Sequence, residues 1–242
     1  MFELNPDRKT FIDSVNGRTV IIIDDFYKNP DEVRNLALTS ERRRDPKLIN
    51  GLPGSRVFVE TDELKKNVKP FFDELCLSDI WRTNIDEKMY EFQWDAVGFM
   101  VNIMDEESVH EWPFLSIPHQ DRYSTDIGTD ITQFGVVVYL NTPEECQGGT
   151  NLYSYKNSMS VPYNSLDYID KPEGFDEECK RPEDLFPYIM NWLQGDKEWR
   201  VEYEAKMVYN RCVFYESDVL HAAHLDVGMF TEHERVNQVF FL

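Results

Sequence analysis

The sequence predicts a mainly β fold with flanking helices, in which two sheets form a barrel of the jelly-roll kind. Three observations lead to this prediction. From about residue 90 onward, short apolar or alternating runs follow one another between turn residues. Helix signals lie mainly before that point. A His-x-Asp motif and a later histidine stand at the ends of β-like runs, as ligands do at one end of a barrel.

The length of 242 residues and the hydrophobic content of 41% suit one domain with a sizeable core. We expect a single domain over residues 1–242, with an N-terminal α/β support region at 1–90 and the β core at 91–242. Residues 156–198, rich in Asp, Glu, Pro and Asn, are expected to be an insertion within that core. Such an excursion is either a lid near a substrate site or a purely structural loop, and the sequence leaves both open.

The charge balance of 45 acidic against 25 basic residues gives a net charge of −20. It argues against binding to nucleic acids and to anionic membrane surfaces, and permits a basic protein partner or a small-molecule or peptide substrate. The first residues lack the features of a secretory signal, and no apolar run is long enough to cross a bilayer. Four scattered cysteines without a Cys-x-x-Cys pair indicate free thiols and a cytoplasmic setting. The oligomeric state stays open.

The N-terminal region is expected to alternate strands and helices. The β-branched run Thr19–Asp24 predicts a buried strand, and Asn29 followed by Pro30 predicts a helix start, with the helix running to about Glu41. A loop at 48–56 and a short strand at 57–60 come next. Thr61 is expected to cap a second helix that Pro70 bends or interrupts. Its apolar positions keep the helical period: Leu64, Val68, Phe71, Phe72 and Leu75.

The β core is expected to contain eight or so short strands, most of which can be placed in the sequence. Their ranges are 92–104, 133–141, 150–155, 199–205, 208–215, 220–224 and 235–242. The strand at 133–141 alternates, which predicts a half-buried strand with one apolar face. That face carries Phe134, Val136, Val138 and Leu140.

His119 and Asp121 are the central candidates for chemistry. Residues two apart on a strand point to the same side, so one imidazole and one carboxylate can reach the same metal ion. His221 would complete a two-histidine, one-carboxylate set, which holds non-haem Fe(II) and leaves open positions. On its own, His-x-Asp is also compatible with a polar strand end. His224 competes with His221, but residues three apart face opposite sides, and only His221 follows the Ser217-Asp218 turn.

Five motifs in order resemble the double-stranded β-helix core of the Fe(II)/2-oxoglutarate-dependent oxygenases, specifically the prolyl-hydroxylase-like branch. They are His119-x-Asp121, Phe134-Gly-Val-Val-Val-Tyr-Leu-Asn141, Gly148-Gly-Thr150, Ser217-Asp-Val-Leu-His221 and Arg235 at the start of the last strand. The resemblance covers 92–242 apart from the insertion. It departs from the family at Val208-Tyr-Asn-Arg211, where glycine is usual, although asparagine tolerates the positive φ of a turn.

This resemblance implies a dioxygenase that uses Fe(II), 2-oxoglutarate and O₂ and hydroxylates a peptidyl residue or an amino-acid-like substrate. It assigns the metal to His119, Asp121 and His221, and the far carboxylate of 2-oxoglutarate to Arg235, whose planar guanidinium matches a carboxylate. Tyr139 and Asn237 are expected to line the same pocket. Since halogenating relatives lack the carboxylate ligand, Asp121 favours hydroxylation.

Two other classes of function remain open at this point. One is a cupin-like metal enzyme without 2-oxoglutarate, in which Arg235 would be dispensable. The other is a non-catalytic binding protein with the same fold. If the cation for the co-substrate is not Arg235, the nearest alternative is Arg211. The substrate's identity is the part of the resemblance that transfers least.

Overall fold

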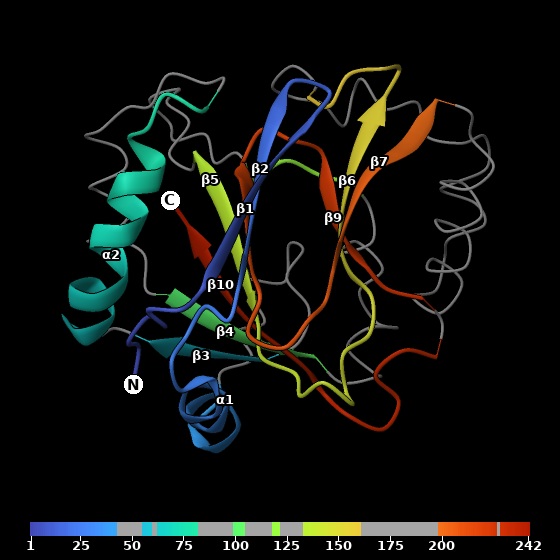
Figure 1. Ribbon diagram of the computed structural model, residues 1–242. Coiled ribbons are helices and arrows are strands. Elements are labelled where there is room, and N and C mark those ends of the chain that lie inside the picture. The colour runs from blue at the N-terminus through green and yellow to red at the C-terminus, as the bar shows by residue number, and fades with distance from the viewer. Residues whose placement is uncertain are drawn as a thin grey trace, which may run out of the picture.

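The computed structural model describes residues 1–42, 55–59, 62–81, 99–104, 118–121, 133–160, 198–226 and 228–242. Within these residues the protein is mainly β, with two antiparallel sheets and two helices (Figure 1). None of the helices in these ranges is both long and apolar enough to cross a membrane. Cys76, Cys146 and Cys212 are free thiols, as expected for these three positions.

The larger sheet has seven strands in the order β1-β2-β8-β5-β10-β4-β3. The N-terminal strands extend the core sheet at both edges, β1 and β2 on one side and β3 on the other, so the support region and the core share one sheet. The strands of this sheet are β1 (Lys9–Val15), β2 (Arg18–Asp24), β3 (Ser55–Val59), β4 (Phe99–Met104), β5 (Phe134–Tyr139), β8 (Cys212–Glu216) and β10 (Arg235–Phe241).

The smaller sheet has three strands in the order β7-β6-β9. They are β6 (Gly149–Tyr155), β7 (Trp199–Lys206) and β9 (His221–His224). A single bridge between His119 and His221 adds the His-x-Asp segment beside β9. This bridge places His119 and Asp121, two of the candidate metal ligands, at the free edge of the smaller sheet.

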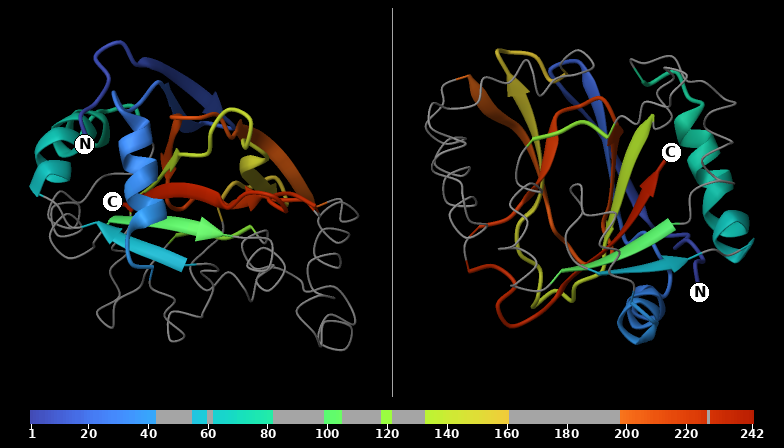
Figure 2. Two further views of the ribbon diagram at one scale, coloured as in Figure 1. Left: turned by 90° about the horizontal axis from the view of Figure 1, so that it is seen from below. Right: turned by 180° about the vertical axis from the view of Figure 1, so that it is seen from behind.

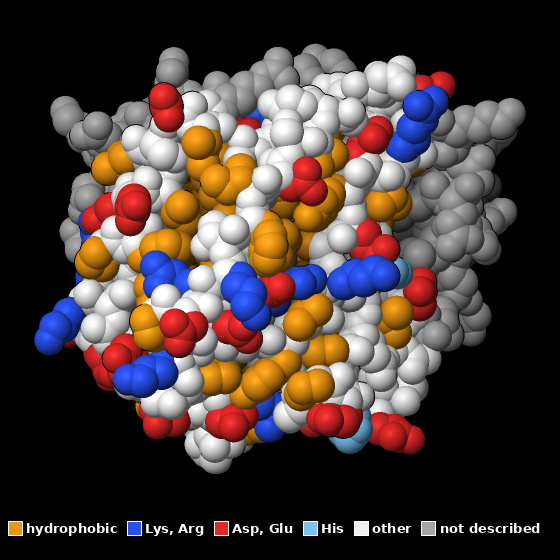
Figure 3. Space-filling view, in the orientation of Figure 1, with side chains coloured by type: hydrophobic (Ala, Val, Ile, Leu, Met, Phe, Trp, Pro, Cys, Tyr) orange, Lys and Arg blue, Asp and Glu red, His pale blue; other side chains and the backbone are white. Residues whose placement is uncertain are grey.

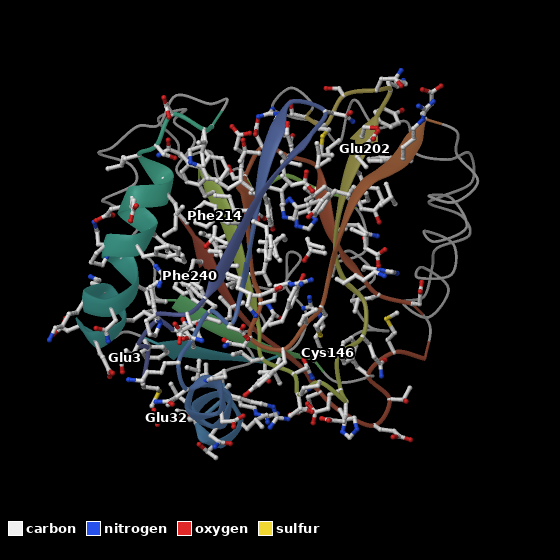
Figure 4. The ribbon with its side chains drawn as sticks, viewed as in Figure 1. Glu3, Glu32, Cys146, Glu202, Phe214 and Phe240 are labelled. Atoms are coloured by element: carbon white, nitrogen blue, oxygen red, sulfur yellow. The ribbon has the colours of Figure 1, made fainter. Side chains whose placement is uncertain are left out.

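Helices α1 (Pro30–Thr39) and α2 (Asp62–Cys76) flank the larger sheet away from the smaller one, as the views from below and behind show (Figure 2). A helix-side core fills the space between them and the sheet. Its centre is aromatic: the Phe72 ring of α2 lies 5.4 Å from the Phe214 ring and 5.2 Å from the Phe240 ring, centroid to centroid. Figure 4 labels Phe214 and Phe240, which lie between α2 and the strands.

A second, inter-sheet core separates the two sheets. It contains Val20, Ile22, Val137, Tyr139, Leu152, Val213, Tyr215 and Val239 among others. The apolar face predicted for β5 is confirmed, because Phe134, Val136 and Val138 face the helix-side core. The half-buried character was wrong: Val137 and Tyr139 are also buried, on the opposite face. The cause is the smaller sheet, which covers the face of β5 that the alternating pattern had predicted to be exposed to solvent.

Strand β1 was not expected from the sequence. It forms a hairpin with β2 through Asn16 (φ 50°) and Gly17 (φ 77°). Positive φ at both turn residues matches the right-handed twist of paired strands, and Asn-Gly is the usual sequence for such a turn. Phe11 and Ile12 on this edge strand are 53% and 60% exposed. The face that carries the hairpin shows apolar side chains among charged ones (Figure 3).

The two predicted helices are present with altered ends. Helix α1 ends at Thr39, and the Asn29 side chain makes no capping hydrogen bond. Helix α2 continues through Pro70, so Pro70 does not interrupt it, and the alternative of a bend stays a prediction. Residues on both sides of Pro70 are completely buried, Leu64 and Val68 before it and Phe72 and Cys76 after it. Tertiary packing therefore stabilises both halves against the missing backbone hydrogen bond.

Strand β8 begins at Cys212, later than predicted, because the four residues before it form a turn with Asn210 at φ 61°. The side chain of Asn210 accepts a hydrogen bond from the Tyr27 amide and donates one to the Tyr27 carbonyl, each 2.8 Å long. Asparagine thus adopts the positive φ at a turn where the resembled family usually has glycine, and its side chain adds a contact to the N-terminal region. Strand β3 begins at Ser55, inside the predicted loop. The helix expected near 183–193 lies outside the described residues, as do 161–197 of the insertion.

Candidate metal centre

Backbone pairing brings the His-x-Asp segment to the start of β9. The amides and carbonyls of His119 and His221 exchange two hydrogen bonds of 2.9 Å. The Asp121 amide donates a third, also 2.9 Å, to the Ser217 carbonyl in the turn before β9. These three bonds align residues that are far apart in sequence, and they leave the three side chains on one side of the pairing.

The ligand atoms of His119, Asp121 and His221 all lie within 4.8 Å of one another, so the group could hold a metal ion. One Asp121 carboxylate oxygen is 3.0 Å from His221 Nε2, and the other is 3.6 Å from His119 Nε2. Adjacent ligands about 2.1 Å from a metal and at right angles are themselves about 3 Å apart. The spacing therefore suits three neighbouring positions on one ion, with the opposite side left for other ligands.

Burial increases across the group from His119 to His221. The His119 side chain is 40% exposed, Asp121 is 14% exposed and His221 is 6% exposed. His221 Nδ1 lies 2.8 Å from the Val219 carbonyl, and a proton on Nδ1 donates to it. This contact leaves the lone pair of Nε2 for a metal, an arrangement found behind most metal-binding histidines. The site thus opens toward solvent on the His119 side.

The charges of the site favour a bound cation. Burial alone would raise the pKa of the Asp121 carboxyl, but the adjacent His221 imidazole, with a smaller contribution from His119, brings that pKa below its usual value. Burial would lower the pKa of His221, and the Asp121 carboxylate raises it above the ordinary value instead. The ionised carboxylate and two imidazoles are donors that a divalent transition metal requires, and a bound metal would take the place of the proton that Asp121 favours on His221.

His224, the competing histidine, lies apart from this group. Its two ring nitrogens face Glu204 at 3.2 Å and Asp226 at 3.4 Å. The strand alternation of β9 explains the separation, since His221 and His224 are three residues apart. The preference for His221 therefore agrees with the geometry.

Arg18 stabilises the turn between β8 and β9, to which the His-x-Asp segment is hydrogen-bonded. The sequence motifs did not indicate this residue. From β2, its guanidinium reaches both carboxylate oxygens of Asp218, at 3.0 and 2.6 Å, and Glu216 at 3.0 Å. The side chain is only 7% exposed. The side-chain amide of Gln120 donates to the Asp218 carbonyl, so Gln120 and Asp121 are both hydrogen-bonded to this turn. Contacts between such distant segments leave no local signal in the sequence.

Arg235, Asn237 and Tyr139 come together on the inner face of the larger sheet. Asn237 lies opposite Tyr139 in the pairing of β10 with β5. One terminal nitrogen of Arg235 donates to the Asn237 side-chain oxygen at 2.7 Å, so the two residues share a strand face as predicted. The Tyr139 side chain reaches from β5 to the smaller sheet, where its hydroxyl lies 2.6 Å from Thr150 Oγ1 of β6.

Arg235 is a buried cation, 5% exposed, and no carboxylate of the described residues lies within ion-pair distance of it. Its Nε is buried without a hydrogen-bond partner in the same part of the chain. Burial lowers the pKa of the guanidinium, and Tyr139 and Tyr215 offset part of this effect. Arg211, the alternative cation, is already paired with Asp24, at 2.5 Å from Nε and 3.0 Å from a terminal nitrogen. A buried guanidinium with no carboxylate partner among the described residues can therefore accommodate an anion.

Comparison with known protein families matches residues 8–234 to DUF6445, a family of unknown function. The chain belongs to this family. The match includes His119, Asp121 and His221 and ends at Glu234, one residue before the buried arginine. Among curated proteins, no sequence matches the chain. Family membership therefore leaves the chemistry to be argued from the site.

Proposed function

We propose that the protein is a non-haem Fe(II)- and 2-oxoglutarate-dependent dioxygenase that hydroxylates a peptidyl residue or an amino-acid-like substrate. Three features support the proposal: the His119, Asp121 and His221 group, the buried cation Arg235, and the order of the strands. The first is compatible with several metal enzymes. The buried cation Arg235 carries the proposal, because a buried positive charge requires an anion in the same interior of the protein.

The strand order supports a jelly-roll core of the double-stranded β-helix type. Strands β4, β10, β5 and β8 are consecutive in the larger sheet, and the His119 segment, β9, β6 and β7 are consecutive in the facing one. Two facing groups of four are the pattern of such a barrel, since the chain alternates between the sheets at nearly every connection. The candidate metal ligands then stand at one end of the barrel.

Arg235 shares the inter-sheet space with the candidate metal ligands. Tyr215 of the inter-sheet core interacts electrostatically with both Asp121 and Arg235, and its ring lies 4.7 Å from the His221 ring. An anion that binds a metal at one end and Arg235 at the other would neutralise the buried charge. A dicarboxylate with a keto group beside one carboxylate meets both requirements, which favours 2-oxoglutarate over a ligand with a single anionic group.

Each residue then has a defined role. His119, Asp121 and His221 would hold iron through three adjacent positions, and Arg235 would pair with the far carboxylate of the co-substrate, with Asn237 holding its guanidinium in place. Bound iron and 2-oxoglutarate supply the activation of O₂ for hydroxylation. The apolar side chains of the inter-sheet core exclude water around the buried charges, which strengthens their interaction.

The experiment is an anaerobic calorimetric titration with Fe(II) or Mn(II) first and 2-oxoglutarate second, for the wild type, Arg235→Lys and Arg235→Ala. Loss of one member of a buried charge pair costs about 3–5 kcal/mol, which is a roughly 100- to 5000-fold loss of affinity. We expect this loss of 2-oxoglutarate affinity for Arg235→Ala and an intermediate loss for Arg235→Lys, which keeps the charge but not the planar donor pair. Metal affinity should stay unchanged in both variants.

Arg211→Ala is the matched control, because Arg211 already has a carboxylate partner in Asp24. It should bind 2-oxoglutarate like the wild type. Tight metal binding together with no preference for 2-oxoglutarate over a generic dicarboxylate would favour the cupin-like alternative. Absence of metal binding would favour a non-catalytic binding protein.

A further inference from the structure

Tyr215 is an aromatic residue in contact with the candidate metal centre. It lies on β8, is 2% exposed and belongs to the inter-sheet core. Its ring lies 4.7 Å from the His221 ring, with the two planes inclined by 54°. The Tyr215 side chain therefore lies beside His221, the most buried of the three candidate ligands.

Gly135 makes room for this ring. Gly135 lies directly opposite Tyr215 in the pairing of β5 with β8. A Cβ atom at position 135 would lie 2.7 and 2.8 Å from two ring carbons of Tyr215 and 3.0 Å from its hydroxyl oxygen. A side chain here would displace the tyrosine, so the glycine lets the ring lie flat across β5 beneath His221.

The hydroxyl of Tyr215 belongs to the ring that contacts His221, and it lies within electrostatic range of both charged sites. Asp121, Arg235 and Tyr139 are the charged or titratable groups that act on it. No hydrogen bond joins this hydroxyl to any residue within the described ranges. The hydroxyl is also not among the fully buried polar atoms without a partner, so it keeps some accessible surface, where a ligand can accept a hydrogen bond from it.

Tyr139 differs in this respect, although the sequence motif drew attention to it first. Its hydroxyl lies 2.6 Å from Thr150 Oγ1 and 3.4 Å from the Ala205 carbonyl. These contacts join the two sheets and use the donor and acceptor capacity of the phenol. Tyr139 is therefore satisfied within the protein, whereas the Tyr215 hydroxyl donates to none of the residues that the structure describes.

We propose that the Tyr215 hydroxyl donates a hydrogen bond to the anionic ligand that lies between the metal group and Arg235. The inference rests on the proposed function, in which that ligand is 2-oxoglutarate. It adds a binding residue from β8 that the sequence motifs did not indicate. Gly135 is then a positioning residue, since it acts through the tyrosine ring.

The test compares Tyr215→Phe with the wild type in the anaerobic presence of Fe(II). Tyr215→Phe keeps the ring against His221 and removes only the hydroxyl. We expect unchanged metal affinity, a roughly ten- to hundredfold weaker affinity for 2-oxoglutarate, as for loss of a hydrogen bond to a charged group, and a shifted visible charge-transfer band of the complex. Tyr153→Phe is the control, because Tyr153 belongs to a separate cluster with Trp199 and accepts a hydrogen bond from Asn151.

The possible outcomes separate the two proposals. Wild-type affinity and an unshifted band in Tyr215→Phe would overturn the role of the hydroxyl while the proposed function stands. Loss of metal binding in the same variant would show that Tyr215 is a structural support for His221, which also overturns it. A wild-type protein that binds metal but not 2-oxoglutarate would refute both proposals.

Discussion

Arg18 holds Asp218 with both terminal nitrogens of its guanidinium, at 3.0 and 2.6 Å. The pair joins β2, near the N-terminus, to the turn between β8 and β9. That turn supplies the carbonyl that Asp121 binds through its amide, at 2.9 Å, and it leads directly into His221. A contact at the edge of the fold thus supports two of the three candidate metal ligands.

We expect Arg18→Ala to lower metal affinity by roughly 10- to 100-fold, the range seen when contacts behind metal ligands are removed. Arg18→Lys, which keeps the charge, should recover part of the loss. Arg211→Ala is the control, because Arg211 also pairs with a β2 residue, Asp24, but has no contact with the turn. Metal titration at a temperature where all variants are folded is the measurement. Equal metal affinity in Arg18→Ala and Arg211→Ala would contradict the positioning role.

Asp121→Ala should abolish metal binding, because it removes the only carboxylate of the candidate metal group. The affinity should fall by more than about a hundredfold, since losing a direct ligand costs more than losing a contact behind one. His224→Ala removes a nearby histidine of the same strand that faces Glu204 and Asp226, and it should bind metal normally. Metal analysis after dialysis, with circular dichroism to verify the fold, decides the matter. Full occupancy in Asp121→Ala would place the metal elsewhere.

Gly149→Ala should unfold the start of β6, because an added Cβ would meet the Ala205 carbonyl oxygen at 2.1 Å and the backbone is held at φ 155°. Backbone atoms of β7 cannot move aside without breaking the sheet. Gly17→Ala is the comparison: its φ is 77°, but nothing lies within 4 Å of the added atom. It should lose about 1–2 kcal/mol, the cost of a left-handed residue alone. Urea unfolding should show a clearly larger loss for Gly149→Ala, and equal losses would contradict the steric explanation.

Tyr139 should make the protein sensitive to alkali. Burial raises the pKa of its phenol to about 12, partly offset by Arg235 and Thr150. In the unfolded chain the phenol ionises near pH 10. Its contribution to stability is therefore complete below about pH 10 and is lost as the pH rises toward about 12, at about 1.4 kcal/mol per pH unit. Over that range Tyr139→Phe should lose less stability than the wild type in urea unfolding. Parallel losses in both proteins would contradict the raised pKa.

The sequence alone determined the local parts of this structure. The period of two placed Phe134, Val136 and Val138 on one face and Arg235 with Asn237 on another, because strand alternation is a property of the backbone. Spacing also placed His119 and Asp121 on one side of a strand, and the resemblance to the oxygenases indicated His221 as their partner. Helix α1 began where Asn29 and Pro30 predicted.

Only the tertiary structure decided what covers each face and which distant residues meet. Alternation shows that a strand has two faces, but the second sheet is what buries Val137 and Tyr139. The order of the strands sets Gly135 opposite Tyr215 and brings Arg18 to Asp218, and neither pairing leaves a mark in the local sequence. Arg235 has no carboxylate partner among the described residues for the same reason: whether a buried charge has a partner depends on the residues that folding places around it.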